Sequence, residues 1–286
     1  MDWISTIVNG LLLGSLYGLF GLGLAFAFGI MRIVNVAHGE FIVLAAFLGM
    51  GLFQAFGLNP VLLTLVVALV GFVVGYCLQF GVLNRVLDKD PMAPLLITFG
   101  LSIMLRNLMV EVFGANSQTI DIGAIRMAGF EVAGLNIGVL PLVIASVSVS
   151  LFVALQLMLS RTAFGRQLQA TSDDPEIAQV FGIDYRRMYG IAMGIAVAMA
   201  AIAGVLLAMR SAFTPFSGAD RLLIAFEVVI IGGLGSIWGA LLGGLLLGVA
   251  HLVGLKIASG SGLLFAHLTF FLILIFLPGG LAKWRR

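Results

Sequence analysis

The chain has 286 residues, of which 61% are hydrophobic and only 10% are charged, and its mean hydropathy is +1.17. Soluble domains carry about 25% charged residues, so a water-soluble globule is excluded: so little polar surface could not cover this chain in water. The net charge of +2 is too even to indicate a nucleic-acid-binding surface. We therefore expect an integral membrane protein. Cys77 is the one cysteine, and we expect it to be a small buried hydrophobe.

Long uncharged stretches in the first two thirds of the chain predict helices that cross a membrane, which requires about 20 residues each. Residues 3–31 contain no charge and predict the first crossing. Residues 41–84 are uncharged over about twice that length, and Gly57-Leu58-Asn59-Pro60 near their middle predicts a tight turn between two helices. Further crossings are expected at about 94–113, 135–159 and 188–209.

The last third of the chain predicts helices of unequal length. Residues 222–231 are apolar but short, and Gly232-Gly233-Leu234-Gly235-Ser236 interrupts them. A full-length apolar stretch follows at 237–255, and the last crossing is expected at about 263–277. The fold class is therefore an all-α membrane protein, with residues 1–286 forming a single transmembrane domain. We expect about eight or nine crossings, one of which is a broken or half helix.

Positive side chains in the short loops predict the orientation, because Lys and Arg in such loops stay in the cytoplasm. They cluster in three segments: Arg85 and Lys89; Arg161, Arg166, Arg186 and Arg187; and Lys283, Arg285 and Arg286. These segments are expected on the cytoplasmic side, together with the C-terminus. An odd number of crossings then places the N-terminus outside.

Small residues recur along several predicted helices at a spacing that places them on one face. One such series begins at Ala192 and ends at Ala208, with Gly or Ala every four residues. Similar spacing occurs at Gly10, Gly14 and Gly18. Small side chains let neighbouring backbones approach closely in a membrane, so we expect a dense helical bundle.

The longest polar segment on the predicted cytoplasmic side is 160–187. Asp173 or Asp174 is a good helix N-cap, Pro175 suits the first helical position and Gly182 is a natural helix stop. A short helix from Pro175 to Phe181 should result, with its apolar side chains exposed. Such a helix packs either on its own bundle or on a separate cytoplasmic protein, and we favour the second interpretation.

Three parts of the chain resemble bacterial ABC importer permeases. Gly165-Arg166, Ala170 and the stretch from Asp174 to Gly182 look like their coupling loop. Arg32-Ile33-Val34-Asn35-Val36-Ala37-His38-Gly39-Glu40 is similar to the Arg-Ile-x-Asn-Phe-Ala-His-Gly-Glu segment of the LivH-type permeases of branched-chain amino acid importers. The stretch from Gly232 to Ala240 is also similar, with Trp238 where that family usually has Pro.

This resemblance implies a permease subunit in the bacterial inner membrane that translocates branched-chain or related amino acids. Its partners would be a second, related permease, two cytoplasmic ATPases that use ATP and Mg, and a periplasmic amino-acid-binding protein. The residues implied to couple it to the ATPases are Arg166, Asp174, Pro175, Glu176, Ala178, Phe181 and Gly182. The chain contains no Gly-x-x-x-x-Gly-Lys-Ser/Thr loop, so it is expected to have no nucleotide site, no enzyme activity and no cofactor of its own.

Candidates for the translocation pathway or its gate are polar groups and glycines in apolar surroundings. Asn35, His38 and Glu40 follow the first crossing, and they either cap helix ends near the cytoplasmic mouth or contact the substrate. Glu227 could pair with Arg106 or bind a substrate ammonium group, although Arg106 could simply reach the membrane surface. The remaining candidates are Gly232, Gly233 and Gly235.

Other functions remain open at this point. An ion-coupled secondary transporter would use Glu227 and the break at Gly232. ABC permeases for urea, other amides or simple sugars share the superfamily. A metal site is not expected, because the histidines lack His-Glu-x-x-His spacing. His251 and His267 are expected to be hydrogen-bonded packing residues, and the external loop 114–134 either meets the binding protein or is a surface loop without a partner.

Overall fold

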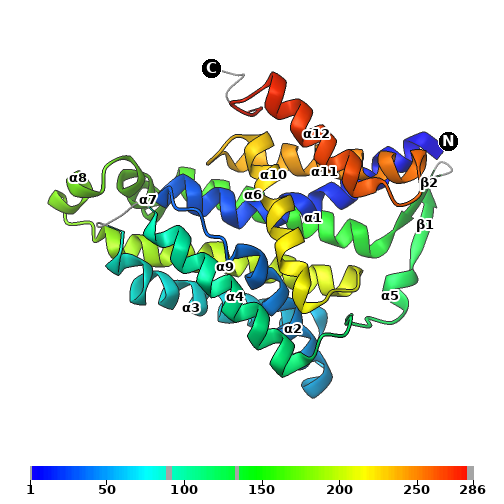
Figure 1. The fold of residues 1–286 in the computed structure, drawn as a ribbon, viewed down its shortest axis with the longest axis horizontal. Helices are drawn as coiled ribbons and strands as arrows, with labels where there is room; N and C mark the ends of the chain where they lie inside the picture. The colour runs from blue at the N-terminus through cyan, green and yellow to red at the C-terminus, as the bar shows by residue number, and fades with distance from the viewer. Residues whose placement is uncertain (1, 88–91, 133–134, 282–286) are drawn as a thin grey trace.

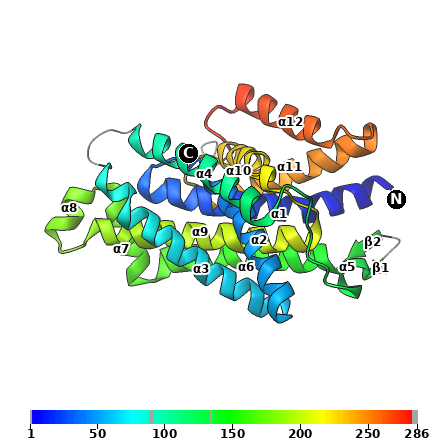
Figure 2. The ribbon, with the colours of Figure 1, turned by 60° about the horizontal axis from the view of Figure 1, so that its bottom comes forward.

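The computed structural model describes residues 2–87, 92–132 and 135–281. The predicted basic residues Lys89, Lys283, Arg285 and Arg286 lie outside these ranges. The elements, shown in Figures 1 and 2, are α1 (Asp2–Met31), α2 (His38–Phe56), α3 (Pro60–Gly81), η1 (Leu83–Arg85), α4 (Ala93–Phe113), α5 (Ala124–Met127), β1 (Gly129–Val132), β2 (Leu135–Gly138), α6 (Val139–Arg161), α7 (Ala163–Asp173), α8 (Pro175–Val180), α9 (Tyr185–Arg210), η2 (Pro215–Ser217), α10 (Gly218–Gly232), α11 (Ile237–Ile257) and α12 (Gly262–Phe276).

Within the described residues, seven helices are long and apolar enough to cross a membrane. They are α1, α2, α3, α4, α6, α9 and α11. The helices α10 and α12 have 15 residues each, or about 22 Å, which is less than the hydrocarbon core of about 30 Å. The all-α class and the approximate count are thus confirmed. One boundary was wrong: residues 135–138 form strand β2, so the fifth crossing begins at Val139.

Two helix pairs form the most extensive contacts of the bundle, and both run antiparallel. In the α1–α11 seam, a Cβ placed on Gly14 would lie 2.6 Å from the Cα of Leu245, and one on Gly10 would lie 2.7 Å from the Cα of Val249. In the α3–α9 seam, a Cβ on Gly75 would lie 2.6 Å from the carbonyl oxygen of Met193. The small residues predicted to line helix faces therefore bring backbones together.

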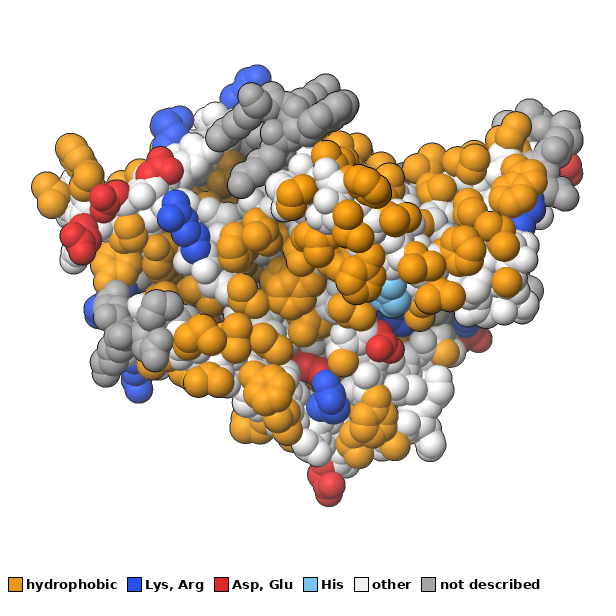
Figure 3. Space-filling view, turned by 45° about the horizontal axis from the view of Figure 1, so that its top comes forward, with side chains coloured by type: hydrophobic (Ala, Val, Ile, Leu, Met, Phe, Trp, Pro, Cys, Tyr) orange, Lys and Arg blue, Asp and Glu red, His pale blue; other side chains and the backbone are white. Residues whose placement is uncertain are grey.

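Helices α1 and α9 form the centre of the bundle. Most of their side chains are buried, including the series from Ala192 to Ala208 on α9. The helices α3, α4 and α12 lie outside this centre and expose many large apolar side chains. Hydrophobic side chains also cover most of the face in Figure 3, whereas charged ones gather at the end that carries α7 and α8. The bilayer is the natural solvent for this apolar surface.

Cys77 corrects a prediction, because it is exposed on α3 rather than buried. It shares this outer face with Val73, Val74 and Phe80, which are also exposed. The small residues of α3 that pack inward are Gly71 and Gly75. Cys77 is therefore part of the apolar outer surface of the bundle and not of its core.

Two interruptions divide the membrane-spanning part of the chain. After α1, Arg32 has a φ of 54° and residues 32–35 have no regular structure, so α2 begins at His38, deep inside the bundle. Between α10 and α11, Gly233 and Gly235 have φ values of 94° and 81°, a left-handed conformation that glycine adopts without strain. The predicted break at Gly232 to Ser236 is thereby confirmed.

The segment between α4 and α6 lies at the opposite end of the molecule from α7 and α8 (Figure 1). It contains α5 and the antiparallel hairpin of β1 and β2. Gln118 exchanges two backbone hydrogen bonds of 2.9 Å with Phe213, which follows α9. This bridge ties the loop to the connection between α9 and α10.

Candidate functional site

The predicted coupling segment is built by a series of side-chain caps. Thr162 accepts a hydrogen bond from the backbone N–H of Gly165 at the start of α7. Asp174 accepts two bonds of 3.0 Å from the N–H groups of Glu176 and Ile177 at the start of α8. Each cap satisfies donors that a helix end leaves free. The predicted short helix is therefore present, one residue shorter than expected.

The tip of α8 exposes its apolar side chains and buries its small one. Ala178 is buried, whereas the side chains of Ile177, Val180 and Phe181 are 57%, 85% and 79% exposed. Gly182 ends the helix with a φ of 79°. Exposed apolar side chains of this size on a capped helix are typical of a docking surface. Of the other predicted coupling residues, Arg166 and Glu176 are exposed, and Asp174 and Pro175 are half-buried.

Sequence reasoning missed the helix α7, which occupies eleven residues of the predicted loop. Its inner face carries Leu168 and Thr171, both fully buried. The hydroxyl of Ser172 donates a bond of 2.7 Å to the carbonyl oxygen of Gly29, near the end of α1. The coupling segment is thus attached to the central helix of the bundle. The Thr162 cap was the signal that could have identified α7.

The first group of pathway candidates lies inside the bundle. The ring Nε2 of His38 is 2.9 Å from the carbonyl oxygen of Phe20, in the middle of α1. The side chain of Asn35 accepts a bond from the N–H of Ala37 and donates to the sulfur of Met193. Both side chains are at least 99% buried. Both lie in the interior because the chain turns back into the bundle after Arg32.

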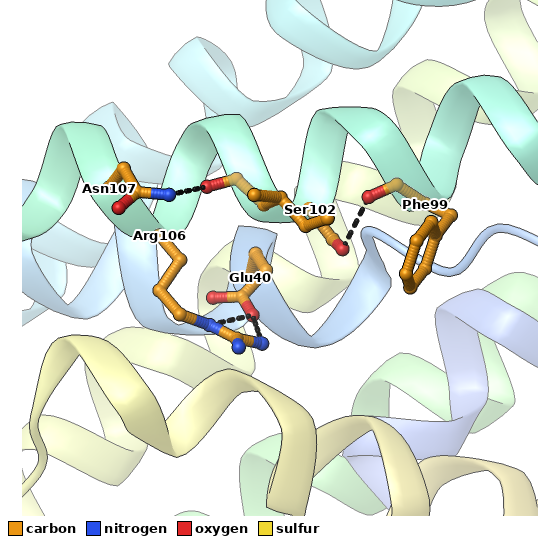
Figure 4. A network of polar contacts seen from close by, with 6 residues as sticks. Glu40, Phe99, Ser102, Arg106 and Asn107 are labelled. Atoms are coloured by element: carbon orange, nitrogen blue, oxygen red, sulfur yellow. Dashed lines mark hydrogen bonds and ion pairs between the residues drawn. The ribbon is translucent and has the colours of Figure 1, made fainter.

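Glu40 and Arg106 form an ion pair that joins α2 to α4 (Figure 4). The Nη2 and Nε atoms of Arg106 donate to Oε1 of Glu40 over 2.6 Å and 3.1 Å. The Glu40 side chain is 2% exposed and that of Arg106 is 33% exposed. Gly218, at the start of α10, lies against the same carboxylate, where a Cβ would overlap it. Three elements thus meet at Glu40.

Glu227 has a different partner from the predicted one. Its Oε1 lies 2.6 Å from Nδ1 of His267, so the pair joins α10 to α12. Arg106 instead pairs with Glu40, so the suggested pairing of Arg106 with Glu227 does not form in this structure. The second Glu227 oxygen is buried without a hydrogen-bond partner in the described part of the chain. Of the remaining candidates, Gly232 packs on Gly239, and Gly233 lies against Gly280.

Glu227→Gln is expected to slow transport several-fold without removing the subunit from the membrane. The amide keeps the size of the side chain and an oxygen for His267, but it removes the buried negative charge that faces this histidine. The measurement is the initial rate of solute uptake, with Glu111→Gln on the exposed face of α4 as the matched control. Wild-type uptake by the Glu227 variant would show that the charge is incidental.

Sequence reasoning missed a polar cluster between α1, α9, α10 and α11. The hydroxyl of Tyr17 lies 3.0 Å from Nδ1 of His251, which confirms that this histidine is hydrogen-bonded. Arg210 and Arg221 line the same cavity. The sequence signal was two arginines, at the end of α9 and in the first turn of α10, but nothing in their spacing places them beside Tyr17. Across the described ranges, no group of three His, Cys, Asp or Glu side chains is placed to hold a metal ion.

The chain is similar in sequence to known permeases. The chain is 29% identical to the high-affinity branched-chain amino acid transport system permease protein BraD of Pseudomonas aeruginosa, over 98% of this chain and 95% of that protein. It is 28% identical to the corresponding LivH protein of Salmonella typhimurium, over 87% and 85%. The probable LivH permease of Methanocaldococcus jannaschii is 29% identical, over 89% and 82%.

The fold also matches a solved structure. PsaBC from Streptococcus pneumoniae, in complex with Fab, aligns with a TM-score of 0.51 over 94% of this chain and 90% of that one. Its sequence identity of 16% supports the shared fold alone. The family described as branched-chain amino acid transport system / permease component matches residues 6–277. The chain therefore belongs to this family of membrane permeases.

Proposed function

We propose that this chain is a transmembrane permease subunit of an ABC importer that carries branched-chain or related amino acids across the inner membrane of a bacterium. Family membership over residues 6–277 supports a transport subunit instead of a catalytic enzyme. The related BraD and LivH proteins are described as branched-chain amino acid permeases. No observation favours an ion-coupled transporter or a permease for urea, amides or sugars.

The observation that supports coupling to ATPase subunits is the exposed apolar tip of α8, in particular Val180 and Phe181. We propose that each cytoplasmic ATPase of the importer receives such a tip in a groove. ATP and Mg would be bound and used by those partners. Their closure would move α7 and α8, and the bond from Ser172 to Gly29 would pass the movement to α1. In this arrangement α7, α8 and the C-terminus face the cytoplasm, and the N-terminus faces outside.

The remaining partners follow from the same proposal. A second, related permease would complete the pathway, as the membership of this permease family suggests. A periplasmic amino-acid-binding protein would deliver the solute to the end that carries β1 and β2. Asp121 and Glu131 are exposed there and are suitable positions for a crosslinking reagent.

The test is purification of the tagged chain in mild detergent, followed by mass spectrometry of the proteins that remain bound. We expect two ATPase subunits and a second permease. Reconstituted into proteoliposomes with the binding protein, the complex should hydrolyse ATP and accumulate labelled L-leucine. Isolation of a homo-oligomer without ATPase activity would contradict the proposal.

Gly182→Ile is expected to uncouple ATP hydrolysis from uptake. No atom lies within 4 Å of a Cβ added at Gly182, so the substitution acts through the left-handed φ of 79° alone. A β-branched residue disfavours that conformation by about 1–2 kcal/mol, which would tilt the tip of α8. In proteoliposomes, the ATP consumed per leucine should rise several-fold at unchanged protein content.

Gly182→Asn is the matched control, because asparagine adopts the left-handed conformation more readily than other residues with side chains. It should keep the coupling close to that of the wild type. Equal coupling in the Ile and Asn variants would show that the helix stop has no part in transmission.

A further inference from the structure

Within the described ranges, two arginines inside the bundle form no ion pair with an acid. Arg210 ends α9 and Arg221 lies in the first turn of α10. The Nη1 atom of Arg210 and the Nε atom of Arg221 are buried and lack a hydrogen-bond partner among the residues that the structure describes. Both acids buried in the bundle are engaged elsewhere, Glu40 with Arg106 and Glu227 with His267.

Both guanidinium groups line one cavity of about 270 Å³ between α1, α9, α10 and α11. Tyr17 and His251 line it as well, hydrogen-bonded to each other. Arg221 also lies 5.9 Å from the centre of the Phe20 ring. The cavity therefore combines two guanidinium groups with a hydroxyl and an imidazole, and no Asp or Glu is among the described residues that line it.

An uncompensated arginine pair in an apolar bundle is unfavourable, because two like charges lose hydration without gaining a partner. Guanidinium groups bind carboxylates through paired, charge-assisted hydrogen bonds. We propose that this cavity is a binding site for the carboxylate of an aliphatic acid, held by Arg210 and Arg221 with the Tyr17 hydroxyl beside it. The unpaired guanidinium nitrogens are the donors that the carboxylate would satisfy.

The rest of the cavity wall indicates which chemical group the ligand carries at the end away from its carboxylate. Five leucines from α1, α9 and α11 line it. Their side chains suit an aliphatic group but not an extended polar one. Identifying the ligand as a transported branched-chain amino acid rests on the function proposed above. The site would then hold the solute by its carboxylate in the half of the bundle that lies away from α7 and α8.

The experiment is direct binding to the purified full-length chain in lipid nanodiscs, without ATPases or binding protein. Labelled L-leucine is displaced by unlabelled L-leucine, by 4-methylpentanoate, which keeps the carboxylate but lacks the amino group, or by L-leucinamide, which lacks the carboxylate. We expect 4-methylpentanoate to displace the label. L-leucinamide should compete at least about tenfold more weakly than L-leucine, because it forms no ion pair. Equal competition by L-leucine and L-leucinamide would overturn the proposal.

Arg210→Gln combined with Arg221→Gln should weaken binding of L-leucine at least about tenfold. Arg126→Gln is the matched control, because Arg126 is exposed in α5, away from the cavity. Thermal unfolding in the same nanodiscs shows whether the double variant is folded. If it is not, the comparison of L-leucine with L-leucinamide on the wild-type chain decides the question.

A lipid headgroup phosphate offers the same anionic chemistry as a carboxylate. Native mass spectrometry distinguishes the two sources. An anionic phospholipid retained by the wild type and lost from the double arginine variant, with no binding of L-leucine or 4-methylpentanoate, would overturn the proposal. Uptake by the reconstituted complex distinguishes failure of the site from failure of the proposed function. If the complex takes up L-leucine but the double arginine variant binds L-leucine as well as the wild type does, the site alone is rejected. If L-leucine binding requires the two arginines but the assembled complex takes up no L-leucine, the proposed function alone is rejected.

Discussion

Gly14→Leu is expected to abolish the folded bundle, with a loss of at least about 3 kcal/mol of stability. The Cβ would lie 2.6 Å from both the carbonyl oxygen of Gly244 and the Cα of Leu245, which are backbone atoms that a rotamer change cannot move. Helices α1 and α11 would have to separate. The measurement is the yield of monodisperse protein after detergent extraction, which should fall several-fold or more.

Gly100→Leu provides the matched control for this prediction. Gly100 is also a helical glycine, in α4, but no atom lies within 4 Å of a Cβ added there. Its yield should equal that of the wild type, because the new side chain extends outward. Equal yields of the two leucine variants would show that the α1–α11 seam does not depend on close backbone approach.

Arg106→Gln is expected to destabilise the bundle by about 2–3 kcal/mol. Removing one member of a buried ion pair leaves an uncompensated charge and costs about 3–5 kcal/mol when both groups are buried. Here the Glu40 side chain is buried but that of Arg106 is one third exposed, so solvent reduces the effect. Unfolding in mixed micelles by increasing amounts of a denaturing detergent measures the change.

The double variant Glu40→Gln with Arg106→Gln tests whether this effect comes from the pair. The second substitution removes the orphaned charge, so it should restore part of the stability lost in Arg106→Gln. Arg126→Gln, in the exposed outer loop, should have no effect beyond about 0.5 kcal/mol. Strictly additive effects of the two substitutions at Glu40 and Arg106 would contradict a direct interaction.

The membrane-spanning helices could be predicted from the sequence because they are long apolar runs, and local start and stop signals mark some of their ends. Pro60 begins α3 after the Asn59 cap, and Gly233 ends α10, as the turn chemistry of both stretches indicated. The same local rules located α8 through Asp174, Pro175 and Gly182. These features depend on residues that are neighbours in the chain.

Pairings between helices could not be predicted in this way. Arg106 meets Glu40 across 66 residues, and Tyr17 meets His251 across 234. Which acid pairs with Arg106 depends on where α2 begins, and that depends on the return of the chain after Arg32. The helix α7 was missed for a related reason. Its eleven residues are polar on one face, and they become a stable helix only when Leu168 and Thr171 pack on the bundle.

The most direct test of the central claim is photo-crosslinking from the tip of α8 within the assembled complex. A benzoyl-phenylalanine placed at Phe181, which is 79% exposed, should form an adduct with an ATPase subunit. The same group at Phe130, exposed on β1 at the opposite end of the molecule, should form none. An active complex in which position 181 gives no ATPase adduct, or in which both positions give it equally, would contradict α8 as the surface that couples this permease to ATP hydrolysis.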